Sequence, residues 1–299
     1  MAIDEDLFDP EFLSRLRSMF FRLRKRRQLR NKGVQPTPAA GFTREFKDHR
    51  SYAAGDDLRT LDWHLYARLG QMFIRIFEEV QEFHVHILLD RSRSMVEPYG
   101  EKRLMALRLT VALAYLALVG EHRVSILTLA EDVHRQLPPL KGQGHIHAIL
   151  RAASALEFSG TTDLVGSLRQ FRPRRDRRGV VFILSDLFGR APDQSAEAIR
   201  QACRWPAETH VIHLLHPREL EPDFDGELRL VDVETRQQRR FWFTDRQRRH
   251  YVQAFAAYMD DLRRSCMRQK VDYYPWTTDR PFEETFLDLL SRGSALAVT

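Results

Sequence analysis

Asp90, Ser92 and Ser94 follow one another at a spacing of two residues, and their oxygen atoms could share one cation. They come directly after the apolar run 85–89. A buried strand has to turn into a helix here, so the three side chains share one tight turn. Carboxylate and hydroxyl oxygens, without sulfur or imidazole, are ligands suited to Mg²⁺ or Mn²⁺. The spacing therefore predicts a metal site.

Two further loops offer oxygen ligands. Thr162 precedes a helical pattern, and Asp186 follows the apolar run 180–185. In open α/β sheets, loops at the carboxyl ends of strands meet where ligands bind, and a divalent ion needs about six oxygens. With only Asp90 and Asp186 as nearby anions, the ion would keep an open position for a carboxylate of a partner. This favours protein binding, and the alternative is that the hydroxyls merely cap helices.

Alternating elements are expected to hold these loops in place. From residue 83 onward, apolar runs alternate with segments of helical periodicity, and a hairpin near 227–243 interrupts them. This alternation is typical of an α/β fold, here a doubly wound, mostly parallel sheet with helices on both faces. The predicted strands are 85–90, 123–130, 180–185, 210–215 and 271–276, and the predicted helices are 102–119, 145–156, 164–171, 195–205, 245–268 and 282–290.

Three stretches are predicted along the chain. Residues 1–40 form an amphipathic helix and a linker, residues 41–82 a small β-rich module, and residues 83–299 the α/β domain. The helix carries an apolar stripe that we expect to pack on the body of the protein, with a partner or a membrane surface as the alternative. The stripe consists of Phe12, Leu13, Leu16, Met19, Phe20 and Leu23.

The charge distribution leaves nucleic-acid binding open as an alternative function. The 47 basic and 41 acidic residues give a net charge of +6, and arginines gather in residues 169–178 and 236–249. Such stretches are more often solvated faces than binding sites. Residues 241–243 are aromatic and could stack on bases, but we expect them to form a buried hairpin face.

The compartment follows from what the sequence lacks. No apolar run approaches the ~20 residues that span a bilayer, and no apolar signal core is found near residue 1. Cys203 and Cys266 lie far apart and form neither a disulfide framework nor a zinc motif. We therefore expect a cytoplasmic protein without stable membrane insertion.

A phosphatase is the enzymatic alternative. A strand-end Asp90, with Ser185 and Asp186 on a later strand, is similar to haloacid-dehalogenase-type phosphatases, in which an aspartate attacks phosphate. Those enzymes need an acid two positions after the nucleophile for acid–base catalysis, and Ser92 stands there. The sequence also has no Gly-x-Ser-x-Gly elbow and no phosphate-binding P-loop. We expect a protein that is not an enzyme.

The three loops resemble a known binding site. Asp90-x-Ser92-x-Ser94, Gly160-x-Thr162 and the strand-end Asp186 resemble the metal-ion-dependent adhesion site of von Willebrand factor A-type domains. By that resemblance, Ser92, Ser94 and Thr162 would contact the ion directly or through water. The two aspartates would hold coordinating waters.

A second stretch resembles the domain-of-unknown-function family 58. The motif comprises Arg50, Tyr52, Gly55, Asp56, Asp57, Arg59, Asp62, Trp63 and Arg68. In that family this segment precedes an A-type domain, and the resemblance covers roughly residues 41–290. It implies partnership with a MoxR-type AAA+ ATPase in the remodelling or assembly of other proteins, and the chain resembles the shorter, soluble members.

The motif can also be interpreted physically. Gly55 permits a turn with positive φ, and carboxylates and guanidinium groups of opposite charge stand close together around it. Such a set forms either a structural ion-pair network or a binding surface, and the sequence leaves both open.

Overall fold

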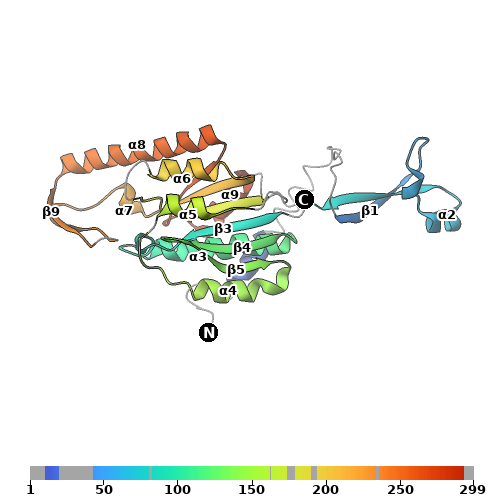
Figure 1. Ribbon diagram of the computed structural model, residues 1–299, viewed down its shortest axis with the longest axis horizontal. Coiled ribbons are helices and arrows are strands. Elements are labelled where there is room, and N and C mark those ends of the chain that lie inside the picture. The colour runs from blue at the N-terminus through green and yellow to red at the C-terminus, as the bar shows by residue number, and fades with distance from the viewer. Residues whose placement is uncertain are drawn as a thin grey trace. The chain divides into compact units, whose positions relative to one another are not determined.

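The computed structural model of the protein describes residues 11–19, 43–80, 83–161, 163–173, 179–189, 194–233 and 236–292 (Figure 1). The chain forms two compact units. Residues 1–27 and 83–298 belong to the first, which we call the main unit, and residues 28–82 with residue 299 belong to the second, which we call the module.

A six-stranded sheet runs through the main unit. Neighbouring strands are parallel, except that β4 and β5 are antiparallel. The apolar runs of the four central strands fit strands that are buried on both faces. The doubly wound α/β fold predicted from the sequence is confirmed. The order across the sheet is β10 (Asp272–Thr277), β7 (Ala207–Leu215), β6 (Gly179–Ser185), β3 (His84–Asp90), β4 (Arg123–Leu129) and β5 (Val133–Leu140).

Helices cover both faces of this sheet. Successive residues of a strand point to opposite faces, so an apolar strand contributes side chains to the core on each side. In β3, Val85, Ile87 and Leu89 join the core on one face, and Leu88 joins the core on the other. The first face is covered by α3 (Glu101–Val119), α4 (Ile146–Ser154) and α9 (Phe282–Arg292). The second is covered by α5 (Leu164–Gln170), α6 (Gln194–Ala202) and α8 (Asp245–Gln269).

The helix at residues 11–19 packs on the main unit. Phe12, Leu16 and Met19 are buried in the core of the first face. The ring of Phe12 lies 5.6 Å from that of Phe282, and Arg15 forms a 3.0 Å ion pair with Glu283. The apolar stripe of these nine residues is therefore covered by the same chain. Phe20 and Leu23 lie outside the described residues.

Two elements of the main unit differ from the sequence-based expectation. The edge strand β5 was not predicted, because its half-exposed residues include Pro138 and Pro139 and give no apolar run. The hairpin forms as β8 (Gly226–Val231) and β9 (Gln238–Phe243). Its expected burial is wrong, since Phe243 is buried but Phe241 and Trp242 are exposed.

The module is built on the antiparallel pair β1 (Thr43–Ser51) and β2 (Phe73–Val80). The segment between them forms the 3-10 helix η1 (Leu58–Thr60) and the helix α2 (Trp63–Leu69). The β-rich character is as predicted, whereas α2 was not expected. Only Leu61 and Ile74 are buried among the side chains that the structure describes in this unit.

Candidate metal centre

The predicted ligands Asp90 and Asp186 come together because β3 and β6 are neighbours. The two strands pair in parallel, with Leu89 opposite Leu184, so both carboxylates follow at the same edge of the sheet. The hydroxyl of Ser185 donates a 2.6 Å hydrogen bond to Oδ2 of Asp90. Asp90 and Asp186 are both buried.

The turn after β3 gathers the two serines. The backbone N–H of Ser92 donates to Oδ1 of Asp90 at 2.9 Å, and the hydroxyl oxygens of Ser92 and Ser94 lie 3.0 Å apart. Ser92 begins the 3-10 helix η2 (Arg93–Met95), yet its side chain makes no capping hydrogen bond. This geometry disfavours the alternative in which the hydroxyl of Ser92 only caps a helix.

The third predicted loop lies beside this turn. The carbonyl of Gly160 accepts a 3.2 Å hydrogen bond from the backbone N–H of Arg93, and Ser159 donates to the carbonyl of Arg91 at 2.9 Å. Thr162 lies outside the described residues. The hydroxyl of Thr161 donates to Glu131 at 3.3 Å.

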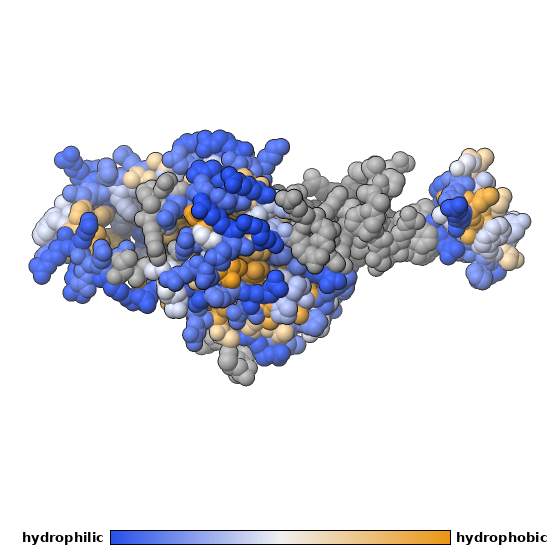
Figure 2. All heavy atoms as spheres, in the orientation of Figure 1, coloured by the Kyte–Doolittle hydropathy of each residue, from blue (hydrophilic) through white to orange (hydrophobic). Residues whose placement is uncertain are grey.

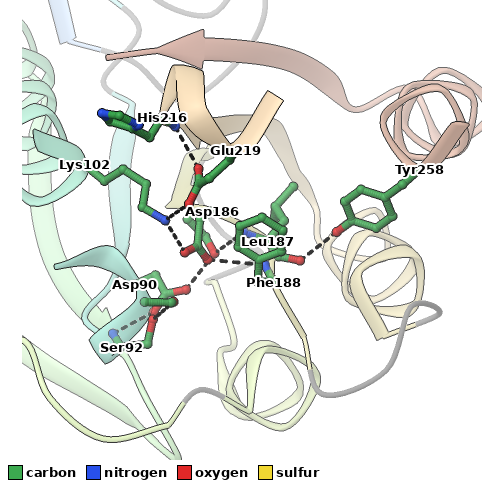
Figure 3. Close-up of polar contacts among 11 residues, drawn as sticks. Asp90, Ser92, Lys102, Asp186, Leu187, Phe188, His216, Glu219 and Tyr258 are labelled. Atoms are coloured by element: carbon green, nitrogen blue, oxygen red, sulfur yellow. Dashed lines mark hydrogen bonds and ion pairs between the residues drawn. The ribbon is translucent and has the colours of Figure 1, made fainter. Parts of the chain in front are cut away.

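A buried lysine that the sequence did not point to completes the cluster (Figure 3). Nζ of Lys102, on α3, lies 3.0 Å from Oδ2 of Asp186 and 2.6 Å from Oε1 of Glu219. The lysine side chain is only 1% exposed. Glu219, on α7 (Pro217–Leu220), also accepts a 2.7 Å hydrogen bond from the backbone N–H of His216. We call Asp90, Ser92, Ser94, Lys102, Asp186 and Glu219 the strand-end cluster.

Burial and like charge dominate the electrostatics of this cluster. Burial and the neighbouring charge of Asp186 raise the pKa of Asp90. Burial would lower the pKa of Lys102, but Asp186 and Glu219 outweigh it and raise that pKa. Three carboxylates share the cluster with one ammonium, so two negative charges are left over when all are ionised. The oxygen donors thus suit a hard cation, and the leftover charge favours one.

A histidine and two carboxylates form a separate cluster at the opposite edge of the sheet. Ligand atoms of Glu208, His210 and Asp272, near the beginning of β7 and β10, lie within 4.8 Å of one another. Nε2 of His210 faces Glu208 at 3.5 Å, whereas Nδ1 faces Asp272 at 3.2 Å. The two carboxylates therefore face different nitrogens of the same imidazole ring.

In the module, the family motif forms one ion pair around its turn. Nη2 of Arg50 lies 2.8 Å from Oδ1 of Asp56, and Oδ2 of Asp56 accepts from the backbone N–H of Ala53 at 2.8 Å. Gly55 has φ +106°, a backbone conformation that glycine adopts without steric cost, and this explains why a glycine stands at this position. The backbone N–H of Tyr52 donates to the carbonyl of Met72 at 2.9 Å and ties the turn to β2.

The other motif carboxylates cap helices. Asp57 accepts from the backbone N–H of Arg59 at 2.9 Å, and Oδ1 of Asp62 accepts from the first amides of α2. Within the described part of the chain, neither Arg59 nor Arg68 forms a salt bridge. Trp63 points outward and is 63% exposed. Oδ2 of Asp62 also lies 2.9 Å from Nε2 of His49 and 3.9 Å from Nε of Arg75. The motif therefore combines turn and helix caps with small, separate groups of charged side chains.

The fold places the main unit among doubly wound α/β domains. Solved structures that are similar to this chain include von Willebrand factor A domains. One, from Catenulispora acidiphila, is 18% identical, with 47% of this chain and 35% of that chain covered and a TM-score of 0.37. The SpRpn10 VWA domain is 10% identical, with 72% and 96% covered and a TM-score of 0.39.

Residues 48–260 match the family described as protein of unknown function DUF58. The chain belongs to this family, as the motif around Gly55 predicted. "Uncharacterized protein Rv1480" of Mycobacterium tuberculosis (strain ATCC 25618 / H37Rv) is 26% identical over 269 residues, which is 87% of this chain and 83% of that protein. Among the described residues, no helix has the length and apolar character needed to cross a membrane.

Proposed function

We propose that this protein is a non-enzymatic, metal-dependent protein-binding adaptor. Asp90, Ser92, Ser94, Thr162 and Asp186 would hold Mg²⁺ or Mn²⁺ at the strand-end cluster, and the bound ion would offer a Lewis-acidic position to a carboxylate of a partner protein. The family resemblance suggests a MoxR-type AAA+ ATPase, or the client of such an ATPase, as the partner, and the cysteine usage suggests the cytoplasm as the site of action.

The leftover negative charge of the strand-end cluster is the observation that carries this proposal. Without a metal, three carboxylates and one ammonium would repel an incoming carboxylate. A divalent cation would cancel this leftover charge and place a positive ion at the site, so that an incoming carboxylate would be attracted to the ion. Partner binding should therefore depend on the metal.

The geometry around Asp90 also argues against the phosphatase alternative. Both of its carboxylate oxygens already accept hydrogen bonds, from Ser92 and Ser185, and the side chain is buried. A nucleophilic carboxylate has to reach its substrate with one oxygen. Ser92 offers a hydroxyl where an acid would be needed.

Calorimetric titration of Mg²⁺ and Mn²⁺ into the wild-type protein and the Asp90→Ala variant tests the proposal. We expect saturable binding by the wild type that the substitution abolishes. Asp261→Ala is the matched control, because this exposed carboxylate on α8 pairs with Arg264 and lies outside the strand-end cluster. Repeating the titration in acetate buffer supplies a free carboxylate that stands in for the partner. Equal metal binding by Asp90→Ala and the wild type, or none by the wild type even with acetate, would contradict the proposal.

A further inference from the structure

A cavity of about 790 Å³ opens beside the strand-end cluster. Its walls come from the β8–β9 hairpin, from α7 and α8, and from the loop before α3, and we call it the hairpin pocket. Pockets of about 300–1,000 Å³ are the usual size of ligand sites. It is lined by apolar side chains, with a few charged ones among them.

The apolar wall is one face of the hairpin. Leu228 and Leu230 of β8 and Phe241 and Phe243 of β9 line the pocket, and Leu228 pairs directly with Phe241. Alternate residues of a strand point to opposite faces, so Trp242 does not line it. Leu230 is 50% exposed, and Figure 2 shows hydrophobic surface among hydrophilic residues at this end of the main unit. Exposed apolar surface rimmed by polar groups marks interaction sites.

The charged groups of the pocket are mostly basic. Arg218, Arg246 and His250 line it together with a single carboxylate, Glu219, which is held by Lys102. Arg218 pairs with Asp223 at 3.0 Å. Arg246 and His250 form no ion pair within the ranges that the structure describes. An occupant of complementary charge would carry an acidic group beside its apolar part.

We propose that the hairpin pocket binds a segment of a partner protein in which Asp or Glu lies next to a large apolar side chain, such as Phe or Leu. The apolar side chain enters between the hairpin and α8, and the carboxylate pairs with Arg246. This contact needs no metal, so it goes beyond the function proposed above and does not depend on it.

The pocket is continuous with the strand-end cluster. Tyr99 lines the pocket and stacks on His216, with ring centroids 3.8 Å apart. Glu219 lines the pocket and binds Lys102. Arg236, in the hairpin connection, forms a 2.9 Å ion pair with Glu97 in the loop before α3. The pocket and the strand-end cluster therefore share Glu219 as a common wall residue.

The probe is a random 12-residue peptide library displayed on phage and selected against the full-length protein in the presence of a chelator. We expect enriched peptides that pair Asp or Glu with Phe, Leu or Trp. An enriched peptide is then synthesised, labelled and titrated by fluorescence anisotropy. Phe241→Asp should weaken its binding about tenfold or more, because it removes an apolar wall and adds a charge of the wrong sign.

Matched controls lie one and three residues away. Trp242→Asp changes an equally aromatic neighbour on the other face of the hairpin, and Arg249→Glu changes an exposed arginine of α8 outside the pocket, as the counterpart of Arg246→Glu. Both controls should keep wild-type affinity, and thermal melting of each variant verifies folding. Since phage selection and titration take place in chelator, a negative metal titration leaves this result unaffected.

Three outcomes would overturn the proposal. No peptide is enriched, the enriched peptides carry no acidic residue, or their binding survives Phe241→Asp and Arg246→Glu. A single-stranded oligonucleotide that competes with the peptide and loses affinity in the same two variants would assign the pocket to nucleic acid instead.

Discussion

The main unit and the module treat charge in opposite ways. The main unit buries Lys102 together with Asp186, and their shared ion pair is screened from water. The module leaves Arg50 49% exposed in its pair with Asp56 and uses its other motif carboxylates to cap backbone amides. The comparison teaches that a dense run of charges in the sequence does not predict a buried ion-pair network, whereas a single lysine within a helix can be the centre of one.

Apolar side chains show the reverse contrast. The described helices of the main unit cover both faces of its sheet, and the hairpin pocket is an apolar opening to solvent. Most of the apolar side chains that the structure describes in the module are exposed, and Figure 2 shows hydrophobic surface on it. The exposed set comprises Leu58, Trp63, Tyr66, Leu69 and Met72. The described residues of the module bury little, and caps and turns supply local order among them.

Lys102→Met should have the largest effect on stability. The substitution leaves Asp186 and Glu219 buried without their cation, and breaking one side of a buried ion pair costs about 3–5 kcal/mol of unfolding free energy. Arg50→Met in the module is the counterpart and should leave the urea midpoint of the main unit unchanged. Equal losses of unfolding free energy in the two variants would mean that burial does not make the Lys102 ion pair more important for stability than the exposed pair of Arg50.

The same variant sharpens the metal proposal. Without the ammonium, the carboxylates around Asp186 attract a cation more strongly, so Mg²⁺ should restore part of the lost stability of Lys102→Met by binding the folded state. Urea unfolding with and without Mg²⁺ measures this. A midpoint of Lys102→Met that does not change with Mg²⁺ would indicate that Asp186 is not a ligand.

Gly55→Ala should act on the module alone. Alanine is strained at φ +106°, which costs about 1–3 kcal/mol. Gly144→Ala in the main unit is the matched control, because Gly144 has no positive φ and no atom close to an added Cβ. Hydrogen exchange should show faster exchange of β1 and β2 amides in Gly55→Ala, with β3 unchanged. Unchanged protection of β1 and β2 would show that the turn does not hold the module together.

Two kinds of feature could be predicted from the sequence. One is a strand that is buried on both faces, and the other is a site whose residues lie close together in the chain. The central strands are apolar throughout because helices cover both faces, and Asp90, Ser92 and Ser94 lie within one turn. β5 escapes prediction because it is an edge strand with one exposed side, and α2 because its apolar residues face outward. Lys102 and Glu219 are separated by 117 positions, and only the packing of α3 beside α7 brings them together.

His86 should make the main unit sensitive to acid. Burial, with His84 and Arg135 adding, lowers the pKa of His86 to about 3, against 6.5 for an ordinary histidine. Below pH 6.5 the unfolded chain therefore binds a proton that the folded state excludes. Stability should fall by up to ~1.4 kcal/mol per pH unit as the pH drops from 6.5 toward 3, with no contribution from this group above 6.5.

Urea midpoints between neutral pH and about pH 5 measure this dependence. His86→Leu should show a shallower loss than the wild type, and His64→Leu, on the exposed surface of α2, should follow the wild-type slope. Parallel slopes for His86→Leu and the wild type would assign the acid sensitivity to other groups, such as the buried His213.

Leu69→Lys should have the smallest effect and tests the outward apolar face of the module most directly. Leu69 is 58% exposed at the end of α2, and the helix stop is set by Gly70, whose backbone N–H donates to the carbonyl of Tyr66. A lysine there removes no buried contact, so the thermal midpoint should stay within error of the wild type while solubility rises. Leu61→Lys is the contrast within the same module, because Leu61 is 1% exposed. A clear loss of stability in Leu69→Lys would show that its side chain is covered in the folded protein, and the module would then resemble the main unit in hiding its apolar surface.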